Sequence, residues 1–226
     1  MLEAINTSLF SPIGDDGMIG MLLILNGLKV TLIVTFFAML LGAVLGVGTT
    51  LMKMSSKWYI RFPAELSVGI IRGTPVVVQL VILYFIVLAA FDVDKITAAI
   101  IAFGLNSGAY ISEIIRAGIQ AVDKGQTEAA RSLGLSQAMT MKLIILPQAI
   151  KNILPALGNE FIVLLKETAV IGFIGGVDLM RAGEIIRSRT FEDSIPLFTC
   201  ALIYLFLTYS FTFMLSKFEK RLKQSD

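Results

Sequence analysis

The chain has 226 residues, of which 56% are hydrophobic and 16% are charged, and its formal net charge is +2. Its mean hydropathy of +0.81 exceeds what one soluble core of this length needs, so we expect a protein of the lipid bilayer. The basic residues are spread along the chain rather than gathered in one patch, which argues against nucleic acid as a partner.

Five apolar runs predict an all-α membrane protein with a single domain over residues 1–226. A helix needs about 20 residues to cross about 30 Å of hydrocarbon, and four of the runs approach this length without a charged residue. The remaining run is long enough but contains Glu160, Lys166 and Glu167. The mixed segment from Tyr59 to Arg72 predicts an interfacial helix that leads into the second span. We expect the five transmembrane helices at about residues 20–52, 73–91, 96–121, 153–177 and 194–217.

Lysines and arginines between the spans indicate the orientation. If the spans alternate, the basic linkers that begin at Lys53, Lys124 and Lys217 all lie on one side of the membrane. Such an excess of basic residues marks the cytoplasmic side, whereas the acidic N-terminal segment with Glu3 and Asp15 lies on the other. We therefore expect the N-terminus outside and the C-terminus in the cytoplasm. The N-terminus has no basic start or small-residue cleavage site, so it does not resemble a signal peptide.

A polar interruption lies between the third and fourth spans, over about residues 123–153. Thr127 is a suitable N-cap for a helix of about two turns, and Gly134 is placed to end that helix in a left-handed conformation. Ser136 can cap a second helix, which Pro147 should end or kink. On these local signals alone, the segment also fits a surface helical hairpin of no particular function.

Redox, metal and catalytic chemistry have little support in the sequence. There is no histidine and only one cysteine, Cys200, so no disulfide can form within the chain and a structural zinc site is not expected. The phosphate-binding Gly-rich loop and the Gly-x-Ser-x-Gly nucleophile motif are both absent from the sequence. We expect no catalytic residue and no metal site, and if ATP is used, another chain binds it.

The interruption also contains a pattern that reads Glu128-Ala129-Ala130, three residues, Gly134, nine residues and Ile144-x-Leu146-Pro147. This pattern resembles the EAA motif in the cytoplasmic loop of ABC importer permeases. Over most of its length the chain is similar to the branch of these permeases that takes up histidine, arginine, glutamine, glutamate and opines. The segments that carry this similarity include Arg72-Gly73-Thr74-Pro75 with Gln79, residues 108–119, and Lys166-Glu167-Thr168. A minor departure is Ala169-Val170, where that branch more often has Ser-Leu.

The resemblance implies a type I ABC importer permease with cytoplasmic coupling helices, in the plasma (inner) membrane of a bacterium. It implies that a second permease subunit pairs with this chain, as a homodimer or with a related chain. Two ATPase subunits would bind ATP and Mg²⁺ and dock below, and an extracytoplasmic amino-acid-binding protein would deliver the cargo. This chain would then be a transport subunit and not an enzyme. The expected ATPase-coupling residues are Glu128, Ala129, Ala130, Arg131, Leu133, Gly134 and Leu135.

Charged residues within spans are costly and are functional candidates by default. Glu160 has no opposite charge within one turn on its own helix face, so we expect it, with Asn159, to contact the substrate. The alternative is that a neighbouring helix holds Glu160 as a structural contact. If Glu160 does meet the substrate, the cargo carries a positive charge, which favours arginine, lysine or histidine over glutamate. Glu113 and Arg116 are three residues apart and can simply pair with each other.

The α-carboxylate of an amino acid needs hydrogen-bond donors in return. Free backbone amides beside breaks in helices supply such donors in many transporters. We expect the amides of Gly73 and Thr74, or those of Ser107 and Gly108, to serve in this way. Further candidates for polar contacts with the cargo are the side chains of Asn106, Tyr110 and Gln79.

Two other classes of protein fit parts of the sequence. An ion-gradient-driven secondary amino acid transporter could use Glu113 or Glu160 as its proton carrier, but such proteins usually have two repeated halves, and no internal repeat is evident here. A membrane anchor that only holds partners together would have no need for Glu160 within a span. The ABC importer permease is therefore the preferred interpretation.

Overall fold

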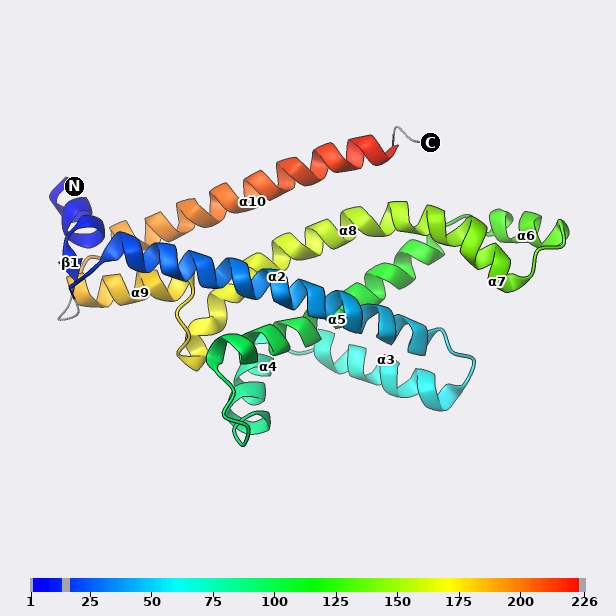
Figure 1. Ribbon diagram of the computed structural model, residues 1–226, viewed down its shortest axis with the longest axis horizontal. Helices are drawn as coiled ribbons and strands as arrows, with labels where there is room; N and C mark the ends of the chain where they lie inside the picture. The colour runs from blue at the N-terminus through cyan, green and yellow to red at the C-terminus, as the bar shows by residue number, and fades with distance from the viewer. Residues whose placement is uncertain (1, 14–16, 224–226) are drawn as a thin grey trace.

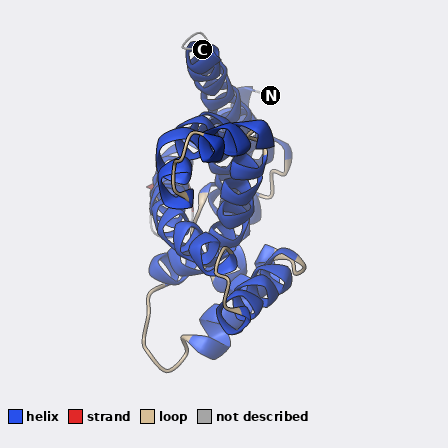
Figure 2. Ribbon diagram, turned by 90° about the vertical axis from the view of Figure 1, so that its right-hand side faces the viewer, coloured by secondary structure: helices blue, strands red, loops and turns tan. Residues whose placement is uncertain are grey.

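The computed structural model describes residues 2–13 and 17–223. Four long helices, α2, α5, α8 and α10, run along the molecule in Figure 1. The N-terminus, a short antiparallel hairpin and α9 lie at one end, and α6 and α7 lie at the other. Figure 2, which looks along the molecule from the α6–α7 end, shows an almost wholly helical protein. The expected all-α fold is therefore confirmed, while Asp15 lies outside the described residues.

The helices and strands follow one another in this order: α1 (Leu2–Ile5), η1 (Asn6–Phe10), β1 (Pro12–Ile13), β2 (Met18–Ile19), α2 (Gly20–Lys53), α3 (Trp58–Arg72), α4 (Val76–Ile82), η2 (Leu83–Val87), α5 (Lys95–Gln120), α6 (Lys124–Ser132), α7 (Gln137–Thr140), η3 (Met141–Ile145), α8 (Leu146–Glu167), η4 (Thr168–Ile174), α9 (Leu179–Thr190) and α10 (Ser194–Lys223). The two strands pair with Pro12 opposite Ile19 and Ile13 opposite Met18. The elements η1, η2 and η3 are π-helical, and η4 is a 3₁₀ helix.

Three described helices, α2, α5 and α10, are long and apolar enough to cross a membrane. The pair formed by α3 with α4 and η2 also passes this test if it counts as one span, but the pair is bent by 107°. In α8, Lys151, Glu160, Lys166 and Glu167 reduce the hydropathy of an otherwise suitable helix. The structure thus supports three or four spans by length and composition, and the count of five stays a prediction.

Two predicted spans differ in extent from the helices that the structure contains. Within residues 73–91, the helical part runs only from Val76 to Val87, about 18 Å at 1.5 Å per residue. Pro75 lies at the N-cap of α4 and separates it from α3. Within residues 153–177, α8 begins before the predicted start and ends at Glu167, where a 3₁₀ helix continues the chain. A run of apolar residues in the sequence does not indicate where one type of helix changes to another.

Helices α2 and α5 pack closely through glycine. A Cβ atom on Gly46 would lie 2.6 Å from Cγ2 of Ile111, and one on Gly108 would lie 3.0 Å from Cβ of Leu45. Glycine therefore allows the two backbones to approach each other, as small residues do in membrane helices. At Gly42, an added Cβ would lie 3.0 Å from Cβ of Ser107, which brings Ser107 into the same interface.

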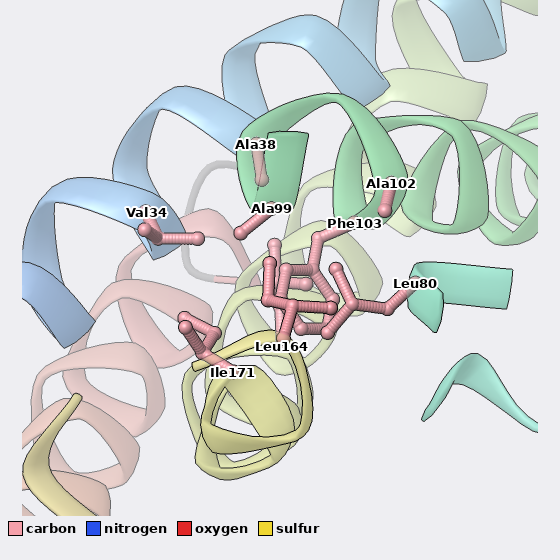
Figure 3. Close-up of a cluster of buried hydrophobic side chains, with 9 residues drawn as sticks. Val34, Ala38, Leu80, Ala99, Ala102, Phe103, Leu164 and Ile171 are labelled. Atoms are coloured by element: carbon pink, nitrogen blue, oxygen red, sulfur yellow. The ribbon is translucent and has the colours of Figure 1, made fainter. Parts of the chain in front are cut away.

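A buried apolar cluster fixes α4, α5 and α8 against α2. In Figure 3, the side chains of Leu80, Phe103 and Leu164 point toward one another. The rest of the cluster comes from α2, α5 and η4, and its members are Val34, Ala38, Ala99, Ala102, Ile171 and Ile174. Because Asn106 and Ser107 lie within about one turn of Phe103 on α5, this cluster sets the position of the candidate site.

Candidate functional site

Glu160 is the buried carboxylate at the centre of the candidate site. Its side chain points from α8 toward α5, where the Ser107 hydroxyl donates a hydrogen bond of 2.9 Å to Oε1. Glu160 is 8% exposed and Ser107 is 0% exposed. Over residues 2–13 and 17–223, no lysine or arginine forms an ion pair with Glu160. A hydroxyl satisfies one lone pair but supplies no positive charge, so the carboxylate keeps the capacity to bind a cation.

Gln79 is the second polar centre, and it is bonded within the chain. Its Nε2 donates to the carbonyl oxygen of Ile71 at 2.7 Å and to Oγ1 of Thr74 at 2.8 Å. Its Oε1 accepts a hydrogen bond of 3.0 Å from Nδ2 of Asn106 on α5. Gln79 therefore closes the bend between α3 and α4 and ties it to α5, which sequence reasoning did not anticipate.

The backbone amides that we expected to be free are used within the chain. The amide of Gly73 donates to the carbonyl of Gly69 at 3.0 Å, because the last turn of α3 continues to Gly73. The amide of Thr74 lies 3.5 Å from the carbonyl of Ile71. Ser107 and Gly108 are in the uninterrupted α5. The expectation of free donor amides at these positions is therefore wrong for this conformation of the chain.

The predicted substrate residues form separate groups. Ser107 and Glu160 meet, and Asn106 meets Gln79, whereas Gly108 faces α2. Asn159 is exposed although it neighbours Glu160 in the sequence. An apolar groove of about 280 Å³ between α3, α4 and α5 has Gln79 and Thr74 in its wall, but not Glu160.

Glu113 is the centre of a charged cluster that joins three helices. Its Oε2 accepts a hydrogen bond of 2.6 Å from Arg116, so the expected pairing is confirmed. Lys53 at the end of α2 pairs with Oε1, and Arg72 at the end of α3 lies 3.6 Å from Oε2. Arg72 also lies over the ring of Tyr110, with 5.3 Å between the guanidinium carbon and the ring centre. The contacts of Lys53 and Arg72 with Glu113 were not predicted from the sequence, because the two residues approach from other helices.

The segment with the EAA-like pattern forms α6, which ends in the predicted glycine turn. Gly134 has φ +86°, and its amide donates to the carbonyl of Arg131 at 3.0 Å. The amide of Leu135 donates to the carbonyl of Ala130 at 3.2 Å, so the turn is a Schellman motif. The predicted N-cap at Thr127 is wrong, because Asp123 caps the helix four residues earlier by accepting a hydrogen bond of 2.6 Å from the amide of Gly125.

The second helix of the loop differs from its prediction at one end. Ser136 caps α7 as expected, accepting a hydrogen bond of 3.3 Å from the amide of Met139. α7 ends at Thr140, and Pro147 lies in the first turn of α8, directly after the π-helical η3 ends at Ile145. The chain thus passes helically from α7 through η3 into α8.

One face of α6 is free for another molecule. Leu133 is 84% exposed, and Glu128 and Ala129 are also exposed. Ala130 is buried, where α6 packs against its own loop. Arg131 donates a hydrogen bond of 2.7 Å to the carbonyl of Leu135, which stiffens the end of the helix.

Comparison with known proteins identifies the family. Residues 38–224 match the family described as binding-protein-dependent transport system inner membrane component. The chain belongs to this family. It is 43% identical over 205 residues to the arginine transport system permease protein ArtQ of Bacillus subtilis (strain 168), covering 90% of this chain and 94% of ArtQ. It is 35% identical over 204 residues to the glutamine transport system permease protein GlnP of Escherichia coli (strain K12), covering 89% and 93% of the two chains.

Two solved structures resemble the permease. A chain of an amino acid ABC transporter crystallised with histidines has 49% sequence identity and a TM-score of 0.85, and the match covers 88% of this chain and 94% of that one. A chain of the inward-facing MetNI methionine ABC transporter has 20% identity and a TM-score of 0.76, covering 89% and 97%, and it supports the fold alone.

The permease is therefore a subunit of an amino acid ABC transporter and a multi-pass bacterial membrane protein. It is not an enzyme, because ATP hydrolysis takes place on the partner ATPase. Membership of the family implies ATPase partners and a second permease subunit. The comparisons do not favour the ion-gradient-driven alternative.

Proposed function

We propose that this permease carries basic amino acids, such as arginine, lysine and histidine, through an ATP-driven importer. The observation that carries the proposal is the buried Glu160, whose carboxylate accepts, among the described residues, a hydrogen bond only from the neutral hydroxyl of Ser107. A charged carboxylate in a membrane is stable only with a suitable partner, and a cationic cargo supplies one. The names of the relatives include both arginine and glutamine, so Glu160 is the basis for choosing a cation.

The cargo's α-carboxylate needs a different set of contacts. The single N–H groups of Gly73 and Thr74 bond within the chain, whereas the side-chain amide of Asn106 has two N–H groups and donates one of them to Gln79. The Tyr110 hydroxyl and the Asn106 amide both belong to α5, the helix that carries Ser107. In this proposal they bind the carboxylate end of the cargo while Glu160 binds its cationic side chain.

We propose further that α6 docks against an ATPase subunit at the cytoplasmic face, with the N-terminus outside. The exposed Leu133 supplies an apolar contact, and Ala129 allows close approach. Because the chain continues helically from α7 to α8, ATPase closure would move α8, and with it Glu160, as a nearly rigid element. An extracytoplasmic amino-acid-binding protein would deliver cargo at the opposite end, which carries α9 and the N-terminus (Figure 1).

The test is uptake into proteoliposomes that contain the whole transporter, supplied with its binding protein. Replacing Glu160→Gln keeps the size and the hydrogen-bonding capacity of the side chain but removes its charge. Loss of a charge-assisted contact of about 1.5–3 kcal/mol lowers arginine uptake about tenfold to a hundredfold. Glu65→Gln is the matched control, because Glu65 is an exposed carboxylate paired with Arg61 on α3.

Competition by a panel of amino acids completes this test. Arginine, lysine, ornithine and histidine should each inhibit uptake of labelled arginine by the wild-type transporter more strongly than glutamate or glutamine. Arginine uptake that survives in the Glu160→Gln variant at the wild-type level would refute the proposed role of the charge.

A further inference from the structure

A second arrangement of residues suited to a cation lies around Arg72. The guanidinium carbon of Arg72 is 5.3 Å from the centre of the Tyr110 ring, and Nη1 is 3.6 Å from Oε2 of Glu113. An aromatic face beside a carboxylate is the chemistry that proteins use to bind guanidinium and ammonium groups. The side chain of Arg72 therefore occupies a place that would equally fit the side chain of a basic amino acid.

Arg72 is the most loosely held of the three cations around Glu113. Arg116 donates to Glu113 at 2.6 and 3.2 Å, and Lys53 pairs with the other oxygen. The 3.6 Å contact of Arg72 is longer than a hydrogen bond, although the side chains of Arg72 and Arg116 are similarly exposed, at 42% and 44%. Arg72 can leave while Glu113 keeps two close cations, so the exchange leaves no buried charge without a partner.

The position of this arrangement relates it to the Glu160 site. On α5, Tyr110 and Glu113 follow Ser107 by three and six residues, or about 4.5 and 9 Å along the helix axis. They thus lie between the Ser107–Glu160 pair and the end of α5 that leads to α6. Arg72 is the last residue of α3, next to the 107° bend before α4, where a change of backbone direction could move its side chain.

We propose that Tyr110 and Glu113 form a second cation site for the cargo and that Arg72 occupies this site in the unloaded permease. A basic cargo that moves along α5 from Glu160 displaces the Arg72 guanidinium from the Tyr110 ring. When the guanidinium returns, it displaces the cargo and promotes its release. Arg72 is then a specificity-determining residue, because a neutral cargo takes no part in this exchange. The proposal rests on the proposed function, in which the cargo is basic.

The competing explanation is that Arg72 only fastens the α3–α4 bend to α5. A fastening of this kind would affect every cargo alike, whereas an exchange of cations affects only a charged one. Arginine and citrulline separate the two explanations, since citrulline has a neutral ureido group in place of the guanidinium and is otherwise the same length.

The first experiment compares maximal uptake of arginine and citrulline by the complete transporter in proteoliposomes. Without the returning guanidinium, the Arg72→Gln variant should release arginine slowly, so its maximal arginine uptake falls about tenfold, the size expected of a partly desolvated cation–π contact. Citrulline uptake should stay within about twofold of the wild type. Arg72→Lys should restore part of the arginine uptake, and added methylguanidinium should also restore it by competing for the site. Arg61→Gln, at the other end of α3, is the matched control.

The second experiment needs no transport. Labelled methylguanidinium should bind to the purified permease–ATPase complex of the Arg72→Gln variant, in which the site is vacant, and less to the wild type. Adding Tyr110→Ala to Arg72→Gln should return the binding to the wild-type level, because the Glu160 site remains, whereas adding Tyr110→Phe should preserve the extra binding because the ring remains.

Two results would overturn the proposal. One is an equal fall of arginine and citrulline uptake in Arg72→Gln, and the other is methylguanidinium binding by that variant that does not exceed the binding by the wild type. Failure of the proposed function has a different signature: the wild-type transporter would not prefer arginine to glutamate. In that case the binding experiment alone would decide whether Tyr110 and Glu113 accept a cation.

Discussion

At the scale of single residues, the carboxylates of this permease differ in the partners that hold them. Asp94 shows how: its carboxylate accepts hydrogen bonds from the amides of Ile96 and Thr97 at the start of α5, at 2.9 and 3.0 Å. The Thr97 hydroxyl donates a third, which is the largest cause of the lowered pKa of Asp94. Glu160, by contrast, is buried, and among the described residues its carboxylate accepts a hydrogen bond from Ser107 alone, which makes it a candidate functional group.

The Asp94 cap predicts a pH-dependent stability. Because the folded-state pKa is lowered below its ordinary value of 3.8, the charged cap stabilises the protein above that pH and loses its effect as the pH falls further. Asp94→Ala should destabilise the permease by about 1 kcal/mol at pH 7, measured by thermal unfolding in detergent. The difference in stability between the variant and the wild type should become smaller below about pH 4.

The control for this prediction is Asp94→Asn, which keeps an acceptor at the N-cap but cannot titrate. It should be more stable than Asp94→Ala at pH 7 but less stable than the wild type, because it keeps the acceptor and lacks the charge. If Asp94→Ala were less stable than the wild type by the same amount at every pH, the charge of Asp94 would have no part in the stabilising effect of the cap.

At the scale of elements, the contact of α2 with α5 sets the geometry of the site. Gly42 and Gly46 on α2 allow α5 to approach closely, and Ser107 lies in that interface before it reaches Glu160. A small displacement of α5 would therefore change the distance from Ser107 to the carboxylate. The stability of the packing between α2 and α5 and the position of the site therefore depend on the same glycines.

Gly46→Ala is expected to disturb this interface. Its new Cβ atom would lie 2.6 Å from Cγ2 of Ile111, so the helices must separate or Ile111 must move, at a cost of about 1–3 kcal/mol. Gly48→Ala is the matched control two residues along the same helix, because a Cβ there has no neighbour within 4 Å. Thermal unfolding in detergent measures the stability of both variants. Equal stability of Gly46→Ala and Gly48→Ala would contradict the described packing.

What the sequence could predict at this scale was local. Gly134 and Ser136 were correctly predicted at the ends of their helices, because turns and caps depend on a few adjacent residues. The pairing of Glu113 with Arg116 was predicted for the same reason. The roles of Lys53 and Arg72 were not, since their approach to Glu113 depends on how α2, α3 and α5 pack.

At the scale of the whole molecule, the permease has two differently equipped ends (Figure 1). One end carries α6, with its exposed Leu133 and its rigid Gly134 turn, and we propose that an ATPase subunit docks there. The other end carries α9 and the N-terminal hairpin. The carboxylates Glu160 and Glu113 lie on the helices between these ends, which is where a coupled transporter needs its cargo sites.

Gly134 gives a direct test of this coupling. Gly134→Val forces a β-branched residue into a left-handed conformation at a cost of about 1–2 kcal/mol, so the turn should loosen. Arginine uptake per ATP hydrolysed should then fall about tenfold. Gly134→Asn should stay near the wild type, because asparagine tolerates this conformation. Unchanged uptake in the valine variant would count against the docking role of α6.

The central claim is that the permease binds a cationic cargo at Glu160. The most direct test is a structure of the complete transporter determined with bound arginine. Our account predicts the guanidinium of arginine within hydrogen-bonding distance of the Glu160 carboxylate, on the side of α8 that faces Ser107. Arginine bound elsewhere, with Glu160 still held only by Ser107, would contradict the claim.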